Sequence, residues 1–394
     1  MIFSKEITES ATLKFASAAR EINKTGEKVI SLGLGEPDFP TPEHIIEATY
    51  RAMQDGFTRY SSPMGLLELR EAICAHLVSQ NSINASPDDI IVTPGAKQAI
   101  LLSLMAILEP EDEVIVLTPC YVSYVPCVKI AEPNSKVIEI PLLKDDLSIP
   151  VDEIKSNITE KTKLIMLNTP NNPTGRIFSS KELESIVELA ALHGIYILSD
   201  EIYDKLNYSG DRVISPSSIG TPKNQFITVN GFSKAYSMTG WRIGYAAFPS
   251  DLKSKYSRLQ QHINTNTCTF VQKGAIEALV GSQDHIRNYN NLLRERSEAF
   301  TNIISNQDIV SFVPPKGGLF AFLNIEKTGI DSNTFAANLI SEMKVAVTPG
   351  IAFGRDWDGF VRVSFATHID DLKEGAELIC RFASTILSRN KRRA

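Results

Sequence analysis

Short runs of almost continuously apolar residues alternate with segments of helical hydrophobic spacing through the middle of the sequence. Strands buried on both faces have this composition, whereas a strand with one solvent-exposed face alternates apolar and polar residues. We therefore expect an α/β fold in which a mostly parallel central sheet is sandwiched by helices. The predicted strands are residues 89–93, 113–117, 163–167, 195–199 and 225–229.

One intervening helix is delimited by the residues at its two ends. Ser179 and Glu182 have the spacing of a capping box, and Gly194 is typical of the position after a last helical turn. Apolar residues recur at helical spacing between these positions. The pattern predicts a helix with one face toward the core.

The pattern changes after residue 280, where a long polar helix through Glu295 and Arg296 precedes strand signals at residues 319–324 and 361–365. The chain has 394 residues, which is more than one compact core usually contains. We expect a large domain from residues 46–280. Residues 281–394, together with the N-terminal segment 1–45, are expected to form a smaller α+β domain.

The composition argues against several classes of protein. The net charge is −6, so a cationic surface for nucleic acid or for an anionic membrane is not expected. No apolar run reaches the roughly 18 residues of a membrane helix, and the N-terminus has no apolar signal core. The five cysteines lie far apart without a Cys-x-x-Cys pair, which disfavours disulfides and a metal site. A cytoplasmic location is expected.

In an open parallel sheet, ligands bind beyond the carboxyl ends of the strands. Polar residues cluster at these positions in the sequence. They are Gly95, Ala96 and Lys97; Tyr121; residues 168–175; Asp200 and Tyr203; and residues 230–234. These residues are the first candidates for a binding site.

Ser233 and Lys234 follow the predicted strand at residues 225–229. A lysine that is partly desolvated at a strand end has a lowered pKa, so its amine can attack an aldehyde. Arg242, eight residues later, offers a guanidinium group suited to a phosphate dianion. Without this context, Lys234 would be interpreted as an ordinary surface lysine.

Asp200 and Tyr203 follow the strand predicted at residues 195–199. An aspartate at a strand end is ordinarily a turn or cap residue. A carboxylate there can also keep a pyridine nitrogen protonated, and Tyr203 could donate to an oxygen on the same ring or simply pack at a helix start. Residues 168–175 are rich in turn formers and predict a tight loop, in which Asn172 precedes Pro173 and could aim its amide at that oxygen.

Residues 93–99, Thr-Pro-Gly-Ala-Lys-Gln-Ala, have the pattern of a glycine-containing turn that enters a helix. Free N–H groups and the helix dipole at such a turn receive phosphate, although the spacing is not that of a Walker loop. Near the N-terminus, Gly33 and Gly35 lack the third glycine of a dinucleotide fingerprint. Gly35 is a candidate for a close approach to a ligand.

Taken together, these motifs resemble the class I and II aminotransferases of pyridoxal 5′-phosphate (PLP) fold type I, and most closely the bacterial-type aspartate aminotransferases. The resemblance covers nearly the whole chain. The matching positions are residues 35–39, Tyr60, and residues 95–99, 171–175, 199–203, 233–244 and 361–366. The resemblance implies a large PLP-binding domain with a smaller α+β domain.

By this resemblance, Lys234 forms a Schiff base with PLP and Asp200 pairs with the pyridine nitrogen. Tyr203 and Asn172 hold the phenolate oxygen, and Tyr121 stacks on the ring. The family more often has tryptophan at the stacking position in its aspartate-specific members.

The resemblance also implies the phosphate site. Arg242 and the backbone of Gly95, Ala96 and Lys97 hold the phosphate, and Ser233 belongs to the same cofactor site. Tyr60 matches a residue that reaches the phosphate of the neighbouring subunit. A homodimer with composite active sites is therefore implied.

Substrate contacts are implied in the same way. Arg362 matches the arginine that binds the substrate α-carboxylate; without the motif it would be interpreted as a salt-bridged strand residue. Lys97 matches a lysine that meets the distal carboxylate of a dicarboxylic substrate, and its alternative is a solvent-exposed helix lysine. Gly35 and Asn172 border the substrate.

The predicted function is amino-group transfer from an L-amino acid, aspartate first, to a 2-oxo acid such as 2-oxoglutarate by a ping-pong mechanism. Specificity for aromatic amino acids or prephenate, or a broad specificity, remains open. Two other classes are a PLP-dependent carbon–sulfur lyase and a non-catalytic regulator. The second would need an attached DNA-binding element or the loss of Lys234, and the sequence has neither feature.

Overall fold

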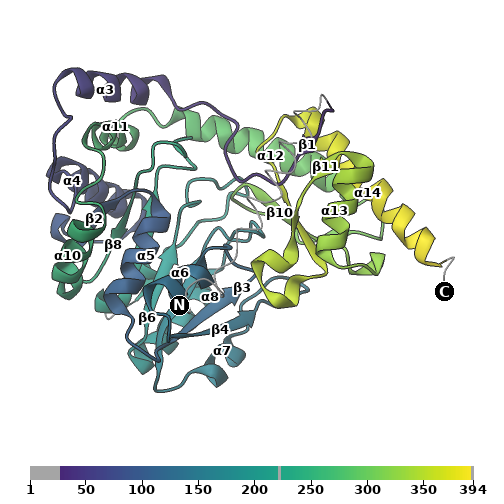
Figure 1. Ribbon diagram of the computed structural model, residues 1–394, viewed down its shortest axis with the longest axis horizontal. Coiled ribbons are helices and arrows are strands. Elements are labelled where there is room, and N and C mark those ends of the chain that lie inside the picture. Colours follow the sequence, from purple (N-terminus) through teal and green to yellow (C-terminus); the bar gives the residue numbers. More distant parts are fainter. Residues whose placement is uncertain (1–26, 221–222, 392–394) are drawn as a thin grey trace.

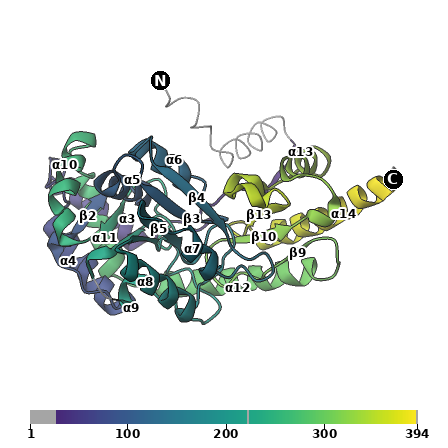
Figure 2. The ribbon, with the colours of Figure 1, turned by 90° about the horizontal axis from the view of Figure 1, so that it is seen from below.

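The computed structural model describes residues 27–220 and 223–391. Of the predicted smaller domain, residues 1–26 and 392–394 lie outside this described part. A seven-stranded sheet and a four-stranded sheet occupy different parts of the molecule, with the C-terminal elements gathered at one end (Figure 1 and Figure 2). No helix in the described ranges is long and apolar enough to cross a membrane.

The seven-stranded sheet has the order β2-β8-β7-β6-β5-β3-β4. Its strands are β2 (Ile90–Thr93), β3 (Glu113–Thr118), β4 (Lys136–Pro141), β5 (Thr162–Asn168), β6 (Tyr196–Asp200), β7 (Phe226–Gly231) and β8 (Gly244–Ala247). Only β8 is antiparallel to its neighbours, β2 and β7. The mostly parallel sheet and all five predicted strands are confirmed.

Helices cover both faces of this sheet. The strand β3 illustrates why such a strand is apolar at nearly every position. Val114 and Val116 pack into one buried cluster with α5 (Ala96–Ile107) and α6 (Tyr124–Ala131). The alternate residues Ile115 and Leu117 pack into another with α7 (Val151–Asn157) and α8 (Ser180–His193). Every side chain of the strand is therefore removed from water on one face or the other.

The predicted ends of α8 are confirmed. The Ser179 hydroxyl and the Glu182 carboxylate make both hydrogen bonds of the capping box, and Gly194 ends the helix in the left-handed conformation. Within the described ranges, the other α-helices before residue 290 are α3 (Glu43–Gln54), α4 (Leu67–His76), α9 (Pro216–Ile219), α10 (Lys253–Ile263), α11 (Thr269–Val280) and the start of α12 (Asp284–Ile304). Residues Leu77–Asn81 continue α4 as a π-helical turn.

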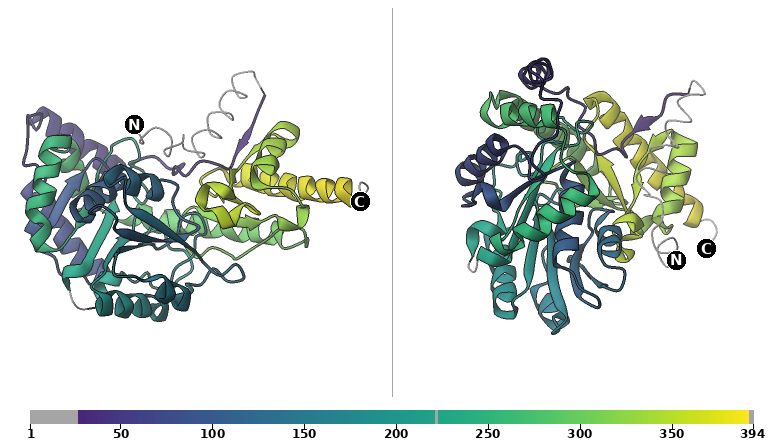
Figure 3. Two further views of the ribbon diagram at one scale, coloured as in Figure 1. Left: turned by 60° about the horizontal axis from the view of Figure 1, so that its bottom comes forward. Right: turned by 60° about the vertical axis from the view of Figure 1, so that its left-hand side comes forward.

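The C-terminal part contains an antiparallel sheet of order β12-β13-β10-β9, which confirms the strand signals there. Its strands are β9 (Ser311–Phe312), β10 (Phe320–Asn324), β12 (Thr348–Pro349) and β13 (Phe360–Ser364). Helices α13 (Ser332–Met343) and α14 (Ile369–Lys391) belong to this part. The N-terminal strand β1 (Ile30–Ser31) pairs with β11 (Val345–Ala346), beside the C-terminal elements in both views of Figure 3.

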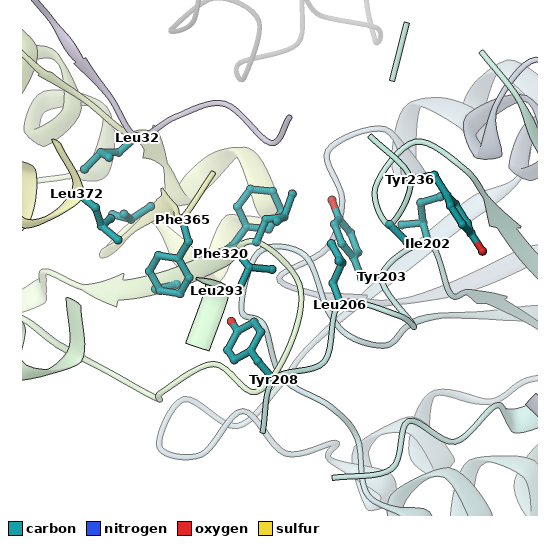
Figure 4. Packing of buried hydrophobic residues seen from close by; sticks show 14 of the residues in the cluster. Leu32, Ile202, Tyr203, Leu206, Tyr208, Tyr236, Leu293, Phe320, Phe365 and Leu372 are labelled. Atoms are coloured by element: carbon teal, nitrogen blue, oxygen red, sulfur yellow. The ribbon is translucent and has the colours of Figure 1, made fainter. Parts of the chain in front are cut away.

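One apolar cluster continues from the large sheet into the C-terminal part. Figure 4 shows Tyr203 and Phe320 beside each other in it, with ring centroids 6.0 Å apart in an edge-to-face arrangement. Leu293 of α12 and Leu372 of α14 belong to the same cluster. The two parts share a buried core, and the domain boundaries at residues 45/46 and 280/281 stay a prediction.

Candidate active site

A cavity of about 360 Å³ opens at the carboxyl ends of the parallel strands, where it meets β10 and β13. Eleven of the predicted site residues line it. They are Gly35, Ala96, Lys97, Tyr121, Asn172, Asp200, Tyr203, Ser233, Lys234, Arg242 and Arg362. Gly95 packs against the Arg242 guanidinium group. Tyr60 lines a separate surface pocket.

The Lys234 amine lies inside this cavity and donates a hydrogen bond of 2.6 Å to the Gly35 carbonyl oxygen. Burial and, to a smaller extent, the Arg362 guanidinium lower the pKa of Lys234 to about 8. The Glu36 carboxylate partly opposes this shift. Near neutral pH, a much larger fraction of this amine is therefore unprotonated than in an exposed lysine, and an unprotonated amine is a nucleophile.

Asp200 is a buried carboxyl at the end of β6. Burial raises its pKa to about 6, while hydrogen bonds from the Tyr124 hydroxyl and the Ile202 amide favour the charged form. The Tyr124 hydroxyl is 2.8 Å from Asp200 Oδ2. The sequence reasoning missed Tyr124, whose only signal is its position three residues after Tyr121; the two rings pack edge to face.

The turn at Gly95 leads into α5 with a positive φ of 88°, which favours glycine. A Cβ atom at this position would lie 2.5 Å from Arg242 Nη2, so the guanidinium group would have to shift from its present place. Arg242 donates to the carbonyl oxygens of Thr239 and Pro94, at 2.9 and 3.3 Å. The guanidinium group is thus held beside the free N–H groups of a helix start, an arrangement suited to an anion.

Arg362 lies on β13 and is buried between the rings of Phe320 and Phe353. It donates to Asn172 Oδ1 at 3.0 Å and to the Gly33 carbonyl oxygen at 2.7 Å. Its Nε has no hydrogen-bond partner within residues 27–220 and 223–391. No carboxylate of this described part pairs with it, so the salt-bridged alternative does not describe this side chain.

Asn172 connects Arg362 with Tyr203. Its backbone N–H donates to Asn168 Oδ1 at 2.7 Å, which fixes the loop after β5. Its side chain also meets the Tyr203 hydroxyl, whose pKa is raised mainly by burial and is partly brought back by Arg362. The tight loop predicted at residues 168–175 is confirmed, with hydrogen bonds from the backbone N–H groups of Gly175 and Thr174 back to Asn171.

Lys97 is exposed at the start of α5, and its amine lies 5.6 Å from the centroid of the Tyr121 ring. No acidic group in the described part of the chain forms an ion pair with it, so the amine is free to meet a ligand. Tyr60 is 88% exposed and lies outside the cavity.

Comparison with known proteins shows which family the chain belongs to. The family model described as "Aminotransferase class I and II" matches residues 27–379. The chain is 38% identical to the aspartate aminotransferase of Bacillus subtilis, with 95% of this chain and 96% of that protein covered. It is 39% identical to aromatic-amino-acid aminotransferase 2 of Thermococcus litoralis, with 89% and 90% covered.

A solved structure extends the likeness to three dimensions. The aspartate aminotransferase of Thermus thermophilus with maleate superposes with a TM-score of 0.90 at 35% identity, covering 96% of this chain and 98% of that one. The sequence resemblance and the predicted α/β fold are thereby confirmed. The chain belongs to the class I and II aminotransferases.

Proposed function

We propose that this aminotransferase uses PLP to transfer the amino group of L-aspartate to 2-oxoglutarate, with Lys234 as the catalytic residue. The observation that carries the proposal is the convergence of three groups in one cavity: an amine of lowered pKa, a buried carboxyl and an anion-binding turn. Members of this family generally depend on PLP, and each of the three groups matches one part of that molecule.

The fit to PLP rests on the space and the charge around the cavity. The Gly95 turn, with Arg242 beside it, would hold the phosphate, and a Cβ atom at position 95 would displace the Arg242 guanidinium group. Asp200 would face the pyridine nitrogen, with Tyr203 and Asn172 at the phenolate oxygen and Tyr121 against the ring. When bound, the cofactor supplies an electron sink for negative charge that develops at the substrate α-carbon.

The residues that would surround the cofactor have separate roles in the reaction. Lys234 Nζ takes the proton from the substrate α-carbon and later returns a proton, so it acts as both base and acid. Asp200 must be ionised for its role, and the Tyr124 hydroxyl stabilises that charged form. The first product leaves as a 2-oxo acid before the acceptor binds, which gives ping-pong kinetics.

Arg362 would orient the substrate by two parallel hydrogen bonds to its α-carboxylate. Its unpartnered Nε supports this role, because a buried guanidinium N–H without an acceptor is costly until a ligand supplies one. Burial between two aromatic rings fixes the plane of the group.

Aspartate is proposed as donor because Lys97 offers a free cation at the rim of the cavity, where a distal carboxylate would lie. An aromatic donor is the second candidate, favoured by the Tyr121 ring in the cavity and by the Thermococcus relative's name.

We also propose that a homodimer completes the site, with Tyr60 of one subunit reaching the phosphate bound by the other. The 88% exposure of Tyr60, an apolar ring beyond reach of its own cavity, supports this assignment. Tyr60→Phe should weaken PLP binding without changing the oligomeric state seen by light scattering. An unchanged dissociation constant for PLP would contradict it.

The experiment that tests the function is a steady-state panel of amino donors with several oxo-acid acceptors on the purified holoenzyme. The proposal expects the highest kcat/KM for aspartate with 2-oxoglutarate and parallel double-reciprocal plots. Intersecting plots would contradict the ping-pong order, and a higher kcat/KM for phenylalanine or tyrosine would favour the second candidate.

A further inference from the structure

A segment of irregular structure, residues 32–42, joins β1 to α3 and passes along the catalytic cavity. We call this segment the strap, and Figure 1 shows it in purple between the C-terminal elements and α3. Residues 33–36 of the strap line the cavity, whereas Asp38 and Phe39 do not. The motif at residues 35–39 therefore continues beyond the residues that the proposed function uses.

Two carbonyl oxygens of the strap accept hydrogen bonds from side chains of the proposed mechanism. The Gly33 oxygen accepts from Arg362 Nη2 at 2.7 Å, and the Gly35 oxygen accepts from the Lys234 amine at 2.6 Å. Arg362 donates from Nη1 to Asn172 Oδ1 at 3.0 Å. Because the guanidinium group is planar and rigid, these acceptors help to set the direction of its remaining N–H groups. The place of Gly33 thus bears on how Arg362 meets a carboxylate.

Asp38 fixes the strap five residues after Gly33. Its two carboxylate oxygens accept from Arg296 Nη1 and Nη2 at 2.8 and 2.7 Å, which makes a bidentate ion pair. Arg296 is buried on α12 and also donates to the Phe365 carbonyl oxygen at 2.9 Å. Phe365 follows β13, the strand that carries Arg362. One guanidinium group therefore connects the strap with the end of that strand.

A second contact holds the same part of the strap on α12. The Phe39 ring stacks on the Tyr289 ring, with centroids 3.9 Å apart and an interplanar angle of 11°. The Tyr289 hydroxyl donates to the Pro40 carbonyl oxygen at 2.9 Å. Three consecutive strap residues are thus attached to one helix.

The other end of the strap is attached to β13 directly. The Ser364 N–H group donates to the Leu32 carbonyl oxygen at 2.8 Å. Gly33 therefore lies between two connections to β13, one at Leu32 and one that runs through Asp38 and Arg296. A change at the second connection can move the Gly33 carbonyl oxygen relative to Arg362.

We propose that Asp38 is a positioning residue for the substrate, because its ion pair with Arg296 holds the strap where the Gly33 carbonyl oxygen orients Arg362. The inference rests on the proposed function, in which Arg362 binds the substrate α-carboxylate. Asp38 touches neither substrate nor cofactor and acts only through the strap. Since every amino donor carries an α-carboxylate, the effect is the same for all donors.

The test measures binding separately from the chemical step. The 2-methyl derivatives of L-aspartate and L-phenylalanine have no α-proton, so the holoenzyme can bind them without completing the reaction. The change in the visible absorbance of the cofactor then gives a dissociation constant. Wild type is compared with Asp38→Asn and with Tyr289→Phe, which loosen the strap from α12 at different contacts.

Asp371→Asn is the matched control. Asp371 pairs with Lys28 at 2.6 Å, and its side chain is 33% exposed, against 28% for Asp38. That ion pair holds the chain before β1 and lies outside the strap. A general effect of losing an ion pair should therefore appear in Asp371→Asn as well.

Asp38→Asn should weaken the binding of both 2-methyl amino acids about tenfold, and Tyr289→Phe about threefold, because each loss removes a hydrogen bond that holds the strap. Asp371→Asn should match wild type. The dissociation constant for PLP, measured by titration of each apoenzyme, should be unchanged in all four proteins. If Asp38→Asn does not fold, Tyr289→Phe decides the matter alone.

Unchanged binding in both strap variants, or equal weakening in Asp371→Asn, would overturn the proposal. A loss confined to 2-methylaspartate would also overturn it, because the strap would then act on the distal carboxylate. An equal loss of PLP binding would make Asp38 a purely structural residue. If wild type itself binds neither 2-methyl amino acid, the proposed function fails as well, whereas normal wild-type binding with unaffected variants contradicts this inference alone.

Discussion

Asp200 and Arg362 border the same cavity but come from different sheets and are held in different ways. Asp200, at the end of β6, already receives hydrogen bonds from Tyr124 and Ile202 within the chain. Arg362, on β13, keeps one buried N–H without a partner among the described residues. In the proposed mechanism, the large sheet therefore presents a carboxyl that is already held within the chain, and the small sheet presents a substrate contact that binding completes.

This difference predicts that variants of the two sheets will affect different kinetic parameters. Changes on the large sheet should reduce turnover with every substrate, because they act on the chemistry common to all donors. Changes at Arg362 or at the exposed Lys97 should act mainly through substrate binding, and those at Lys97 should depend on which donor is offered.

Lys234→Ala should have the largest effect and abolish transamination while the protein stays folded, because the proposed proton transfer at the substrate α-carbon needs the primary amine of Lys234. Circular dichroism would check the fold, and a coupled assay the activity. In wild type, borohydride reduction followed by peptide mapping should find the pyridoxyl group on Lys234. A label on a different lysine would contradict the assignment.

Asp200→Ala should lower kcat by several orders of magnitude with aspartate and aromatic donors alike, since the electron sink weakens without a carboxylate at the ring nitrogen. PLP binding should fall much less, because the phosphate cradle is untouched. The two quantities are measured by steady-state kinetics and by titration of the apoenzyme. Near-normal kcat in the variant would remove Asp200 from the mechanism.

Arg362→Lys should lower kcat/KM by about one to two orders of magnitude for all amino donors, because lysine keeps the charge but cannot make two parallel hydrogen bonds, and one charge-assisted bond is worth roughly 1.5–3 kcal/mol. Cofactor binding should be unchanged. A loss confined to dicarboxylic donors would place Arg362 at the distal end of the substrate.

Lys97→Met should have the most selective effect. Its loss should lower kcat/KM for aspartate by about one to two orders of magnitude, the value of one charge-assisted contact, and leave an aromatic donor almost unaffected. Equal losses for both donors would assign Lys97 to the cofactor or to folding. No loss for either would make it the exposed helix lysine of the alternative interpretation.

The sequence alone predicts the features that depend on local pattern. The apolar runs locate β5 and β6, and the capping box locates the start of α8, because burial on both faces and N-terminal capping leave clear signatures in nearby residues. Edge strand β4 and the short β8, which contains glycine and alanines, lack such a run. Their places depend on neighbours distant in the chain.

Contacts between distant residues account for what the sequence reasoning missed at the site. Tyr124 meets Asp200 across 76 residues, and Asn172 meets Arg362 across 190. A tyrosine three residues after Tyr121 carries no local mark of such a role. The motifs could therefore name the residues of the cavity, but the hydrogen bonds that set their charge states depend on the fold.

A single-turnover experiment tests the central claim most directly. The holoenzyme is mixed with L-aspartate in the absence of any oxo-acid acceptor, and the released oxo acid and the visible absorbance of the cofactor are followed together. The account predicts one equivalent of oxo acid per active site, a matching loss of the original absorbance band, and then no further reaction until 2-oxoglutarate is added. Continuous product release without an acceptor, or no reaction with any amino donor, would contradict it.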